Sequence, residues 1–402
     1  MARQRFTGSF TQQLPIPDEG ITAAAAVMRS GRLHRYNIAG GDESEAMALE
    51  REYAAWQGAR FCLAVASGGQ AMQIALRAAG VRAGETVLTN AFTLAPVPGA
   101  IAAVGAKPVF VETTEDLVID LDDLSSKAKR TGARYLLLSH MRGHLCDMEA
   151  LLAVATEIDL KVIEDCAHTM GATWNGRRSG SFGLAGCFST QTYKHLNSGE
   201  GGLLTSDDAE FIARATILSG SYMLYERHGA GPNADTYTNI RLDTPNMSAR
   251  MDNLRAALLR PQLQGIEEAI CAWNARHDLL AARLAANPEI RIPHRPAAER
   301  YVGSSIQFMI PVISAKSARV LLRLLADMGV EVKWFGAKAP AGFTSDHHSW
   351  RYAGAQDLPR TDAILAGLFD MRLPLTFSLD DCELIADHIL DAVTAVVPKV
   401  EA

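Results

Sequence analysis

Residues 135–168 read YLLLSHMRGHLCDMEALLAVATEIDLKVIEDCAH, and this stretch decides the fold class of the chain. The apolar run at Tyr135–Ser139 predicts a buried strand. Asp147–Glu157 has apolar residues at helical spacing, and Lys161–Glu164 predicts a second strand. Strands that alternate with helices in this way indicate βαβ units and a mostly parallel sheet.

The same alternation continues towards the N-terminus. It predicts strands at Phe61–Val65, Glu85–Thr89 and Pro108–Val111, and helices at Glu43–Gln57, Gln70–Ala79, Pro98–Val104 and Leu121–Lys129. Residues 1–45 contain Pro15, Pro17 and the pair Gly40-Gly41, so we expect this arm to be irregular. The first part of the chain is therefore expected to be an α/β domain.

The sequence after residue 248 has a different pattern. Ser248–Ala286 predicts long helical structure that is interrupted or kinked at Pro261. Four further elements follow: a strand in Val302–Val312, a helix in Ala315–Met328, a strand in Val330–Trp334 and a helix in Leu379–Val396. We expect a large domain at residues 1–260, with an N-terminal arm of about 45 residues, and a smaller α+β domain at residues 261–402.

Composition excludes several classes of protein. The 402 residues are 48% hydrophobic with a net charge of −6, which fits a folded protein with a large core. No basic run is present, so we expect no nucleic-acid partner. The six cysteines lack CxxC or zinc-ligand spacing, which is typical of a reduced cytoplasmic protein without a metal site. We recognise no export signal, and three prolines break the apolar run Ala91–Val111, so we expect no membrane partner.

Ser67-Gly68-Gly69-Gln70 lies between a predicted strand and a predicted helix. Ligands of parallel sheets bind at the carboxyl ends of the strands. Two glycines let the backbone approach an anion, and the start of the helix offers unpaired N–H groups. An ordinary glycine turn has the same pattern, so this segment alone decides nothing.

Asp165 ends an apolar strand, and His168 follows three residues later. A buried carboxylate is costly unless a cation pairs with it, and a protonated ring nitrogen would be such a partner. The alternatives are an aspartate that caps the next turn and a histidine that is only hydrogen-bonded in the core.

Lys194 stands between the polar segment at residues 187–193 and the glycine-rich turn at residues 197–202. Most lysines are solvated surface charges, whereas a catalytic lysine needs a depressed pKa or a bound electrophile such as an aldehyde cofactor. An anion cradle, Asp165 at a strand end and Lys194 together match the parts needed to hold pyridoxal phosphate (PLP). Asp165 would keep the pyridine nitrogen protonated, so that the ring can act as an electron sink.

These segments resemble the DegT/DnrJ/StrS-type aminotransferases, a family of PLP-dependent (sugar) aminotransferases of fold type I. The resemblance extends over about residues 30–395 and rests on seven stretches in the family's order: Phe61–Met72, Val104–Val111, Ser139–Met148, Ile163–Gly171, Phe188–Leu203, Pro245–Leu263 and Arg372–Thr376. The most specific is Phe188–Leu203, which is similar to the family's "fSf...K.lttGEGG". The resemblance implies a fold type I transferase with PLP as its cofactor.

The resemblance also implies roles for single residues. Lys194 falls on the Schiff-base lysine, which also moves a proton, Asp165 on the partner of the pyridine nitrogen, and His168 on a position beside the ring. The cofactor-binding set is completed by Ser67, Gly68, Gly69, Gln70, Ser189 and Ser248. In the family a neighbouring subunit completes the phosphate site, so a homodimer with shared active sites is expected.

Several residues depart from the family pattern. Gly69 replaces a threonine hydroxyl, for which Gln70 is a candidate substitute. Leu94 replaces the aromatic residue that stacks on the PLP ring, and Phe92 is a candidate substitute there. Ser248 replaces the partner subunit's asparagine and is equally typical of a helix N-cap. Met141-Arg142 replaces Leu-Tyr.

We therefore expect a cytoplasmic aminotransferase of a biosynthetic pathway. Its donor would be glutamate or glutamine, and its acceptor a keto-sugar, a keto-cyclitol or a related small ketone. One alternative is other PLP chemistry: sugar dehydratases of the family have histidine in place of the lysine, whereas here Lys194 is present and His195 follows it. The other is a non-catalytic PLP-binding regulatory protein, which would have no need of both Asp165 and Lys194.

Overall fold

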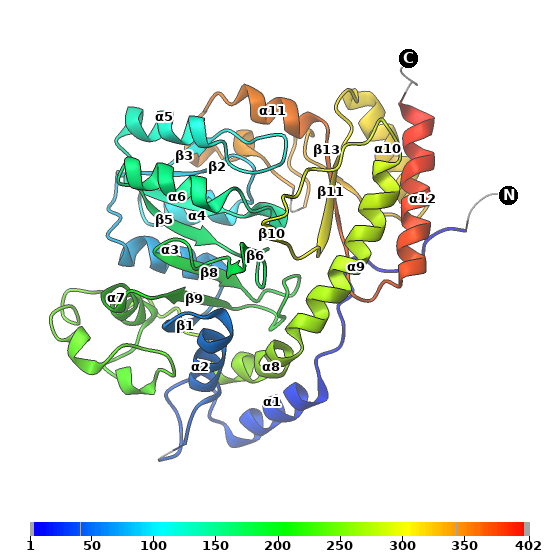
Figure 1. Cartoon of the computed structure of the whole chain (residues 1–402). Coiled ribbons are helices and arrows are strands. Elements are labelled where there is room, and N and C mark those ends of the chain that lie inside the picture. Colours follow the sequence, from blue (N-terminus) through cyan, green and yellow to red (C-terminus); the bar gives the residue numbers. More distant parts are fainter. Residues whose placement is uncertain (1–3, 41, 343, 398–402) are drawn as a thin grey trace.

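A seven-stranded sheet lies at the centre of the computed structural model, which describes residues 4–40, 42–342 and 344–397 (Figure 1). The strand order is β1-β9-β8-β5-β4-β2-β3. The strands are β1 (Phe61–Val65), β2 (Thr86–Asn90), β3 (Lys107–Val111), β4 (Tyr135–Ser139), β5 (Lys161–Asp165), β8 (Ala185–Ser189) and β9 (Gly202–Ser206). Only β9 runs antiparallel to its neighbours, so the predicted mostly parallel sheet is confirmed.

Helices cover both faces of this sheet. One face packs against α2 (Glu45–Gln57), α5 (Leu121–Thr131), α6 (Met148–Glu157) and α8 (Asn253–Gln264), and the other against α3 (Gly68–Ala78), α4 (Pro96–Ala103) and α7 (Ala209–Ser219). Successive strand residues alternate between the two cores: Leu136 and Leu138 face the first, and Leu137 faces the second. Burial on both faces is what makes the parallel strands continuously apolar.

A smaller antiparallel sheet has the order β11-β13-β12. It consists of β11 (Ser305–Met309), β12 (Lys333–Trp334) and β13 (Leu368–Arg372), and it packs with α9 (Ile266–Ala285), α10 (Ala315–Asp327) and α12 (Leu379–Val396). In Figure 1, α9 runs from the lower centre up to lie beside α12. The observed order of elements agrees with the predicted α+β pattern, and the domain boundary near residue 260 stays a proposal.

The remaining elements are short. A three-stranded sheet is formed by β10 (Glu299–Arg300), β6 (Thr173–Trp174) and β7 (Arg177–Arg178), and α11 (Pro359–Ala366) precedes β13. Single 3₁₀ turns occur at Met141–Gly143, Tyr225–Arg227, Ala234–Tyr237, His347–Ser349 and Arg351–Ala353. The first of these turns contributes to the site described below.

The expectation that residues 1–45 are irregular was wrong, because α1 (Asp18–Ser30) lies within them. Four consecutive alanines favour a helix, and Asp18 and Glu19 stabilise its first turn. Gly31 ends the helix in the left-handed conformation, with φ of 68°. α1 packs against α8, so the arm is held on the body of the molecule.

The long helix expected from Ser248 also differs in its limits. It begins at Asn253, and Asp252 is its N-cap, accepting a hydrogen bond from the Arg255 N–H at 2.8 Å. The interpretation of Ser248 as the cap was therefore wrong. Pro261 lies inside α8, and the interruption occurs at Gly265, where α9 starts in a new direction.

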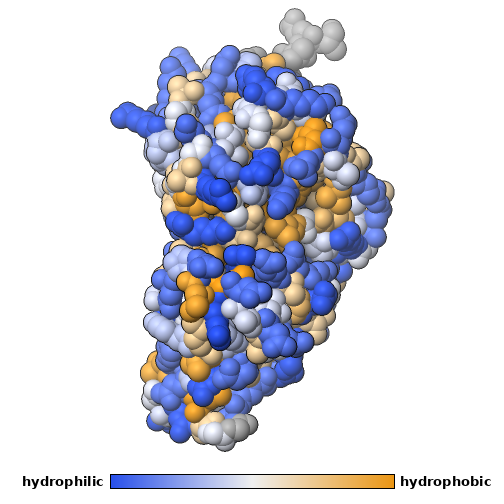
Figure 2. All heavy atoms as spheres, turned by 90° about the vertical axis from the view of Figure 1, so that its left-hand side faces the viewer, coloured by the Kyte–Doolittle hydropathy of each residue, from blue (hydrophilic) through white to orange (hydrophobic). Residues whose placement is uncertain are grey.

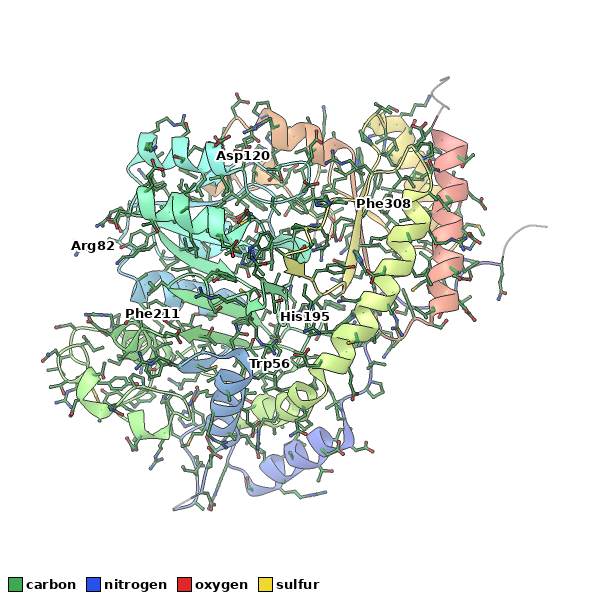
Figure 3. The ribbon with its side chains drawn as sticks, in the orientation of Figure 1. Trp56, Arg82, Asp120, His195, Phe211 and Phe308 are labelled. Atoms are coloured by element: carbon green, nitrogen blue, oxygen red, sulfur yellow. The ribbon has the colours of Figure 1, made fainter. Side chains whose placement is uncertain are left out.

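The parallel strands begin at the edge of the molecule that faces the viewer in Figure 2. Arg82, which precedes β2, and Phe211, at the start of α7, mark this edge on the left of Figure 3. Hydrophilic side chains cover most of this face, and hydrophobic ones gather in separate patches. In the described part of the chain, no helix combines the length and the apolar character needed to cross a bilayer. The carboxyl ends of the parallel strands point the other way, into the molecule.

Candidate active site

A cavity of about 490 Å³ lies at the carboxyl ends of the parallel strands. Ser139, Asp165 and Ser189 are the last residues of β4, β5 and β8, and all three line it. They share one edge because these strands are adjacent and parallel. Arg372, at the end of β13, lines the cavity from the C-terminal part of the chain. The cavity is thus closed by residues from both sheets.

The start of α3 forms an anion cradle on one wall. The Ser67 hydroxyl accepts a hydrogen bond from the Gln70 N–H at 3.1 Å, and the Ser67 carbonyl accepts one from the next residue of the helix. The N–H groups of Gly68 and Gly69 make no hydrogen bond to another described residue. These two donors, at the positive end of a helix dipole, are suited to a phosphate.

Gly68 and Gly69 differ in how much space surrounds them. A Cβ at Gly68 would lie 2.7 Å from the Cβ of Ser189, so only glycine lets the helix approach β8 this closely. A Cβ at Gly69 would meet only the Ser67 hydroxyl, at 3.7 Å. The cavity therefore has room at residue 69 for the side chain that the sequence lacks.

Asp165 and Glu164 lie on opposite faces of β5. The Glu164 carboxylate accepts hydrogen bonds from the N–H groups of Gly180, Phe182 and Gly183 and is fully occupied in the core. Asp165 faces the cavity, where it accepts hydrogen bonds from the Ser139 hydroxyl and the Ala167 N–H, both at 3.1 Å.

Burial raises the pKa of Asp165, although the Ala167 N–H and Lys194 oppose this shift. Desolvation disfavours the ionised carboxylate, and a cationic group bound in the cavity would favour it again. The site therefore has a place for a ligand that carries a positive charge next to Asp165.

Lys194 lies in the turn between β8 and β9, with its Nζ 2.7 Å from His168 Nε2. Burial, and then the charge of Arg142, lower the pKa of Lys194 to about 7, with Asp165 opposing them. Burial and the neighbouring cations, Lys194 first, keep the pKa of His168 well below its usual value, so its ring is neutral.

The hydrogen bonds around His168 assign its tautomer. The Arg142 N–H points at His168 Nδ1 over 3.4 Å, which makes Nδ1 the acceptor and places the ring proton on Nε2. Nε2–H can then donate to the lone pair of a neutral Lys194 amine. This is the state that a nucleophilic lysine requires.

His195, which is labelled in Figure 3, does not line this cavity. Its Nε2 lies 3.0 Å from the Ser304 hydroxyl, and its ring packs edge-on against Trp273 at 5.2 Å. Burial lowers its pKa to about 3. His195 is therefore a neutral packing residue.

Three residues singled out from the sequence do not line the cavity. Gln70 contributes its N–H to the Ser67 cap, and Phe92 packs against Phe335 at 5.3 Å, whereas Leu94 does reach the cavity. Ser248 hydrogen-bonds to Asn246 at an exposed position. Neither substitute proposed for the missing hydroxyl and the missing aromatic ring lies where it would be needed.

Arg372 and Tyr193 are among the lining residues for which the sequence predicted no role. The Arg372 guanidinium lies 3.8 Å from the centre of the Tyr193 ring, beside Lys194. Arg372 was noticed only as the first letter of a motif, because its position at the end of β13 depends on how the two sheets face each other. Tyr193 directly precedes Lys194, and this neighbourhood is the signal that could have found it.

Comparison with known proteins gives concordant findings. The sequence profile described as the DegT/DnrJ/EryC1/StrS aminotransferase family matches residues 16–392. The chain is 34% identical over 224 residues to the spore coat polysaccharide biosynthesis protein SpsC of Bacillus subtilis (strain 168), which covers 55% of this chain and 56% of that protein.

It is also 34% identical over 274 residues to the dTDP-3-amino-3,6-dideoxy-alpha-D-galactopyranose transaminase of Aneurinibacillus thermoaerophilus, covering 66% of this chain and 68% of that protein. The chain thus spans between about half and two thirds of the length of these relatives. The fold is that of the aminotransferase from Psychrobacter cryohalolentis, with a TM-score of 0.83, 20% identity, and coverage of 97% of this chain and 100% of that one.

Proposed function

The chain belongs to the DegT/DnrJ/EryC1/StrS aminotransferase family, and on this premise we propose that it is a PLP-dependent aminotransferase of a biosynthetic pathway. Its donor is glutamate or glutamine, and its acceptor is a keto-sugar, a keto-cyclitol or a related small ketone. The name of the Aneurinibacillus relative supports a sugar-like acceptor. The observation that carries the proposal is the meeting of Lys194, His168 and Asp165 in one cavity with a phosphate cradle.

The residues of the cavity fit PLP. The N–H groups of Gly68 and Gly69, together with the Ser67 and Ser189 hydroxyls, would hold the phosphate, because they are hydrogen-bond donors at a helix start. Asp165 would pair with the pyridine nitrogen, whose positive charge offsets the burial of this carboxylate. Once bound, PLP supplies an aldehyde that takes up the amino group and a ring that withdraws electrons.

The chain's own residues then account for proton transfer. Lys194 Nζ, neutral above a pKa of about 7, takes the proton from the amino-bearing carbon of the donor. His168 Nε2–H holds the amine in position between these transfers. Leu94 gives apolar contact on the cavity wall, and Arg142 and Arg372 face the space left for the substrate.

The positions of two residues favour transamination over the alternatives. Dehydratases of this family use histidine in place of the lysine, but here Lys194 lines the cavity and His195 is packed against Trp273. A regulatory scaffold would not need a lysine with a pKa of about 7 next to a neutral histidine.

The proposal is tested by visible absorbance of the purified protein with PLP, before and after addition of L-glutamate or L-glutamine. We expect a yellow chromophore that a donor bleaches in the wild type and in the control Lys316→Ala, whose lysine is exposed. Lys194→Ala should not show this donor-dependent change. A chromophore that no donor bleaches would favour other PLP chemistry. The absence of any chromophore would refute the proposal that the protein is a PLP-dependent enzyme.

The assembly and the location are part of the proposal. A homodimer with shared sites is supported by the position of Ser248, which lies outside the cavity of its own chain and falls where the family has a residue serving the partner subunit. Light scattering should give twice the mass of one chain. A cytoplasmic location rests on the six cysteines, which are all unpaired thiols.

A further inference from the structure

Two consecutive histidines and one aspartate meet between the 3₁₀ turn His347–Ser349 and the helix α11. His347 Nε2 lies 2.8 Å and His348 Nε2 lies 3.0 Å from the same atom, Asp362 Oδ1. The side chain of His347 is buried, whereas that of Asp362 is 40% exposed and that of His348 is 60% exposed. The three groups therefore converge at a point that an ion can reach from solvent.

The convergence of the two rings needs an explanation, because they belong to neighbouring residues. A 3₁₀ helix has three residues per turn, so successive side chains point about 120° apart. Here the rings of His347 and His348 lie 3.9 Å apart, and both direct Nε2 towards Asp362. His347 Nδ1 is buried and has no hydrogen-bond partner among the described residues, so Nε2 makes the polar contacts of this ring. Ring nitrogens that share one target are the arrangement that a bound cation requires.

The distances in this cluster suit a metal ion. Zn²⁺ binds imidazole nitrogen and carboxylate oxygen at about 2.0–2.2 Å, so two ligand atoms of a tetrahedral site lie about 3.3 Å apart. The ligand atoms of the cluster all lie within 4.8 Å of one another, and the two nitrogens lie 2.8 and 3.0 Å from the carboxylate oxygen. A movement of the exposed Asp362 carboxylate by about 0.3–0.5 Å would give the ion its space.

The chemistry of the ligands favours zinc over the hard cations. In the part of the chain that the structure describes, no lysine or arginine forms an ion pair with Asp362, whose partners are the two imidazole rings. Imidazole nitrogen suits Zn²⁺, whereas Mg²⁺ and Ca²⁺ take oxygen ligands. Three protein ligands leave the fourth position of a tetrahedral zinc ion to a water molecule.

Both segments that carry the ligands are held on β3. The rings of His347 and Trp350 pack against Phe110 of this strand, with centroids 6.2 and 5.5 Å from its ring. α11 is fixed by Glu112, the residue after β3, which accepts hydrogen bonds from the Thr361 N–H at 2.8 Å and the Thr361 hydroxyl at 2.6 Å. The ligands are therefore positioned by the large sheet before any ion binds.

We propose that His347, His348 and Asp362 bind one Zn²⁺ ion. Gly342 and Ser345, which shortly precede the two histidines, line the cavity described above. The ion joins this part of the chain to α11 and thereby fixes one wall of the cavity.

The proposed site departs from the expectation that the chain has no metal site. That expectation came from the six cysteines, which lack zinc-ligand spacing. The ligands are instead two adjacent histidines and an aspartate 14 residues after His348, which the fold brings together. Neither Lys194 nor PLP takes part in the site, so it does not depend on the proposed function.

The test is a calorimetric titration of Zn²⁺ into the full-length chain after dialysis against EDTA and then against buffer. The protein carries no affinity tag, because an oligohistidine tag would itself bind the ion. Mg²⁺ is the comparison ion. The variants His348→Ala and Asp362→Asn each remove one ligand at a solvent-accessible position. His294→Ala is the matched control, because it removes an exposed histidine outside the cluster.

We expect the wild type and His294→Ala to bind one Zn²⁺ per chain with the same affinity. His348→Ala and Asp362→Asn should each bind it about 100-fold more weakly, because loss of a residue that only supports a metal ligand already costs about 10- to 100-fold. Mg²⁺ should not bind measurably. Equal affinity of the wild type and His348→Ala for Zn²⁺ would overturn the proposal, and so would a wild type that binds no Zn²⁺.

Amide hydrogen exchange tests whether the ion fixes the cavity wall. The amides of residues 344–350 should exchange about 10-fold more slowly when Zn²⁺ saturates the wild type, and Zn²⁺ should have no such effect in His348→Ala. Exchange that is the same with and without Zn²⁺ would overturn the role assigned to the ion. If Zn²⁺ binds through His348 but no amino donor changes the chromophore, the metal site stands and the aminotransferase does not.

Discussion

Two of the buried ionic centres in the described part of the chain, around Glu50 and around Asp370, are built differently. Around Glu50, the Arg35 guanidinium donates two hydrogen bonds at 2.8 and 2.9 Å, and the N–H groups of Ala64 and Gly229 donate two more. Both charged residues are completely buried, and their charges cancel. Around Asp370, by contrast, Arg142 Nη2 lies 2.7 Å from the carboxylate, and Arg142 also lines the cavity.

The difference shows how to separate structural from functional buried charge. Burial would raise the pKa of Glu50, yet Arg35 and His228 bring it down to about 2, which marks a centre that is complete within the chain. At the other centre the neighbouring cations, after burial, lower the pKa values of Lys194 and Arg372. A buried lysine with a lowered pKa in a cavity is typical of a functional site. Substitutions at the Glu50 centre should therefore affect the stability of the fold. Substitutions in the cavity beside Asp370 should affect the reaction.

Lys194→Ala should give the largest loss of activity and test whether the cavity residues act in the reaction rather than in stability. Loss of the amine that moves the proton should slow the donor-dependent change in absorbance by about 10²- to 10⁴-fold, when measured at saturating PLP. The free energy of unfolding should stay the same or rise, because a desolvated amine is removed from a cation-rich cavity. A large loss of stability would show that Lys194 is structural and would break the comparison.

Glu50→Gln should lower the stability of the protein and leave its activity unchanged. An uncompensated Arg35 would remain in the core, so the free energy of unfolding should fall by about 3–5 kcal/mol in urea titrations. The control Glu43→Gln, which breaks the exposed pair with Arg51, should cost less than about 0.5 kcal/mol. Activity per folded molecule should be unchanged, and a variant that is stable but inactive would contradict the division of roles.

The same centre predicts a pH dependence of stability. Glu50 has a lower pKa in the folded protein, about 2 against an ordinary value of 4.5, so its ionised form stabilises the fold above pH 4.5. This contribution is lost as the pH falls from about 4.5 towards 2. Unfolding curves of Glu50→Gln should therefore depend less on pH than those of the wild type across this range. Parallel curves would show that another group dominates.

Gly69→Thr should strengthen the binding of PLP at the phosphate cradle. A side chain fits at this position, and its hydroxyl would add one hydrogen bond to the bound phosphate. We expect PLP to bind about 10-fold more tightly, which corresponds to about 1.4 kcal/mol. Gly69→Ala is the matched control, because it adds the Cβ without the hydroxyl. Tightening by alanine to the same extent would assign the effect to the helix backbone instead.

The smallest expected effect is a shift in the titration of Lys194. The rate at which the protein without cofactor captures PLP should rise with pH through about 7, as the ammonium loses its proton. Arg372→Gln removes a neighbouring cation and should move this midpoint upward by about 0.5 pH unit, or about 0.7 kcal/mol. The control Arg323→Gln, which removes one exposed positive charge from α10, should leave it in place, and a downward shift would contradict the assigned electrostatics.

The fold was largely predictable from local pattern. The strands Phe61–Val65 and Tyr135–Ser139 and the helix Leu379–Val396 lie where their periodicity predicts them, because each is buried along a continuous face. α1 was missed since its alanines form no apolar stripe, and two nearby prolines suggested a loop. Its stability comes from α8, which lies far along the chain.

The site residues that could be predicted are those at or just after the ends of the parallel strands. Asp165, Ser189 and Lys194 follow strands that are adjacent in the sheet, and the structure brings them together. The side chains of Gln70 and Phe92 could not be placed, because which way a side chain points depends on packing that no motif records. Arg372 reaches the cavity from the second sheet, and its contact with Tyr193 follows from tertiary structure alone.

The hydrogen bond from Ala64 to Glu50 has a consequence for aggregation. β1 is an edge strand of the large sheet, and such edges can pair with strands of other molecules. Its outward N–H groups are all occupied: Cys62 donates to Ala230, Ala66 donates to Ala249, and between them Ala64 donates to the Glu50 carboxylate. The Glu50 carboxylate therefore occupies the middle of this edge, and backbone carbonyls occupy its two ends. A strand of another molecule cannot accept hydrogen bonds from β1 while these bonds are in place.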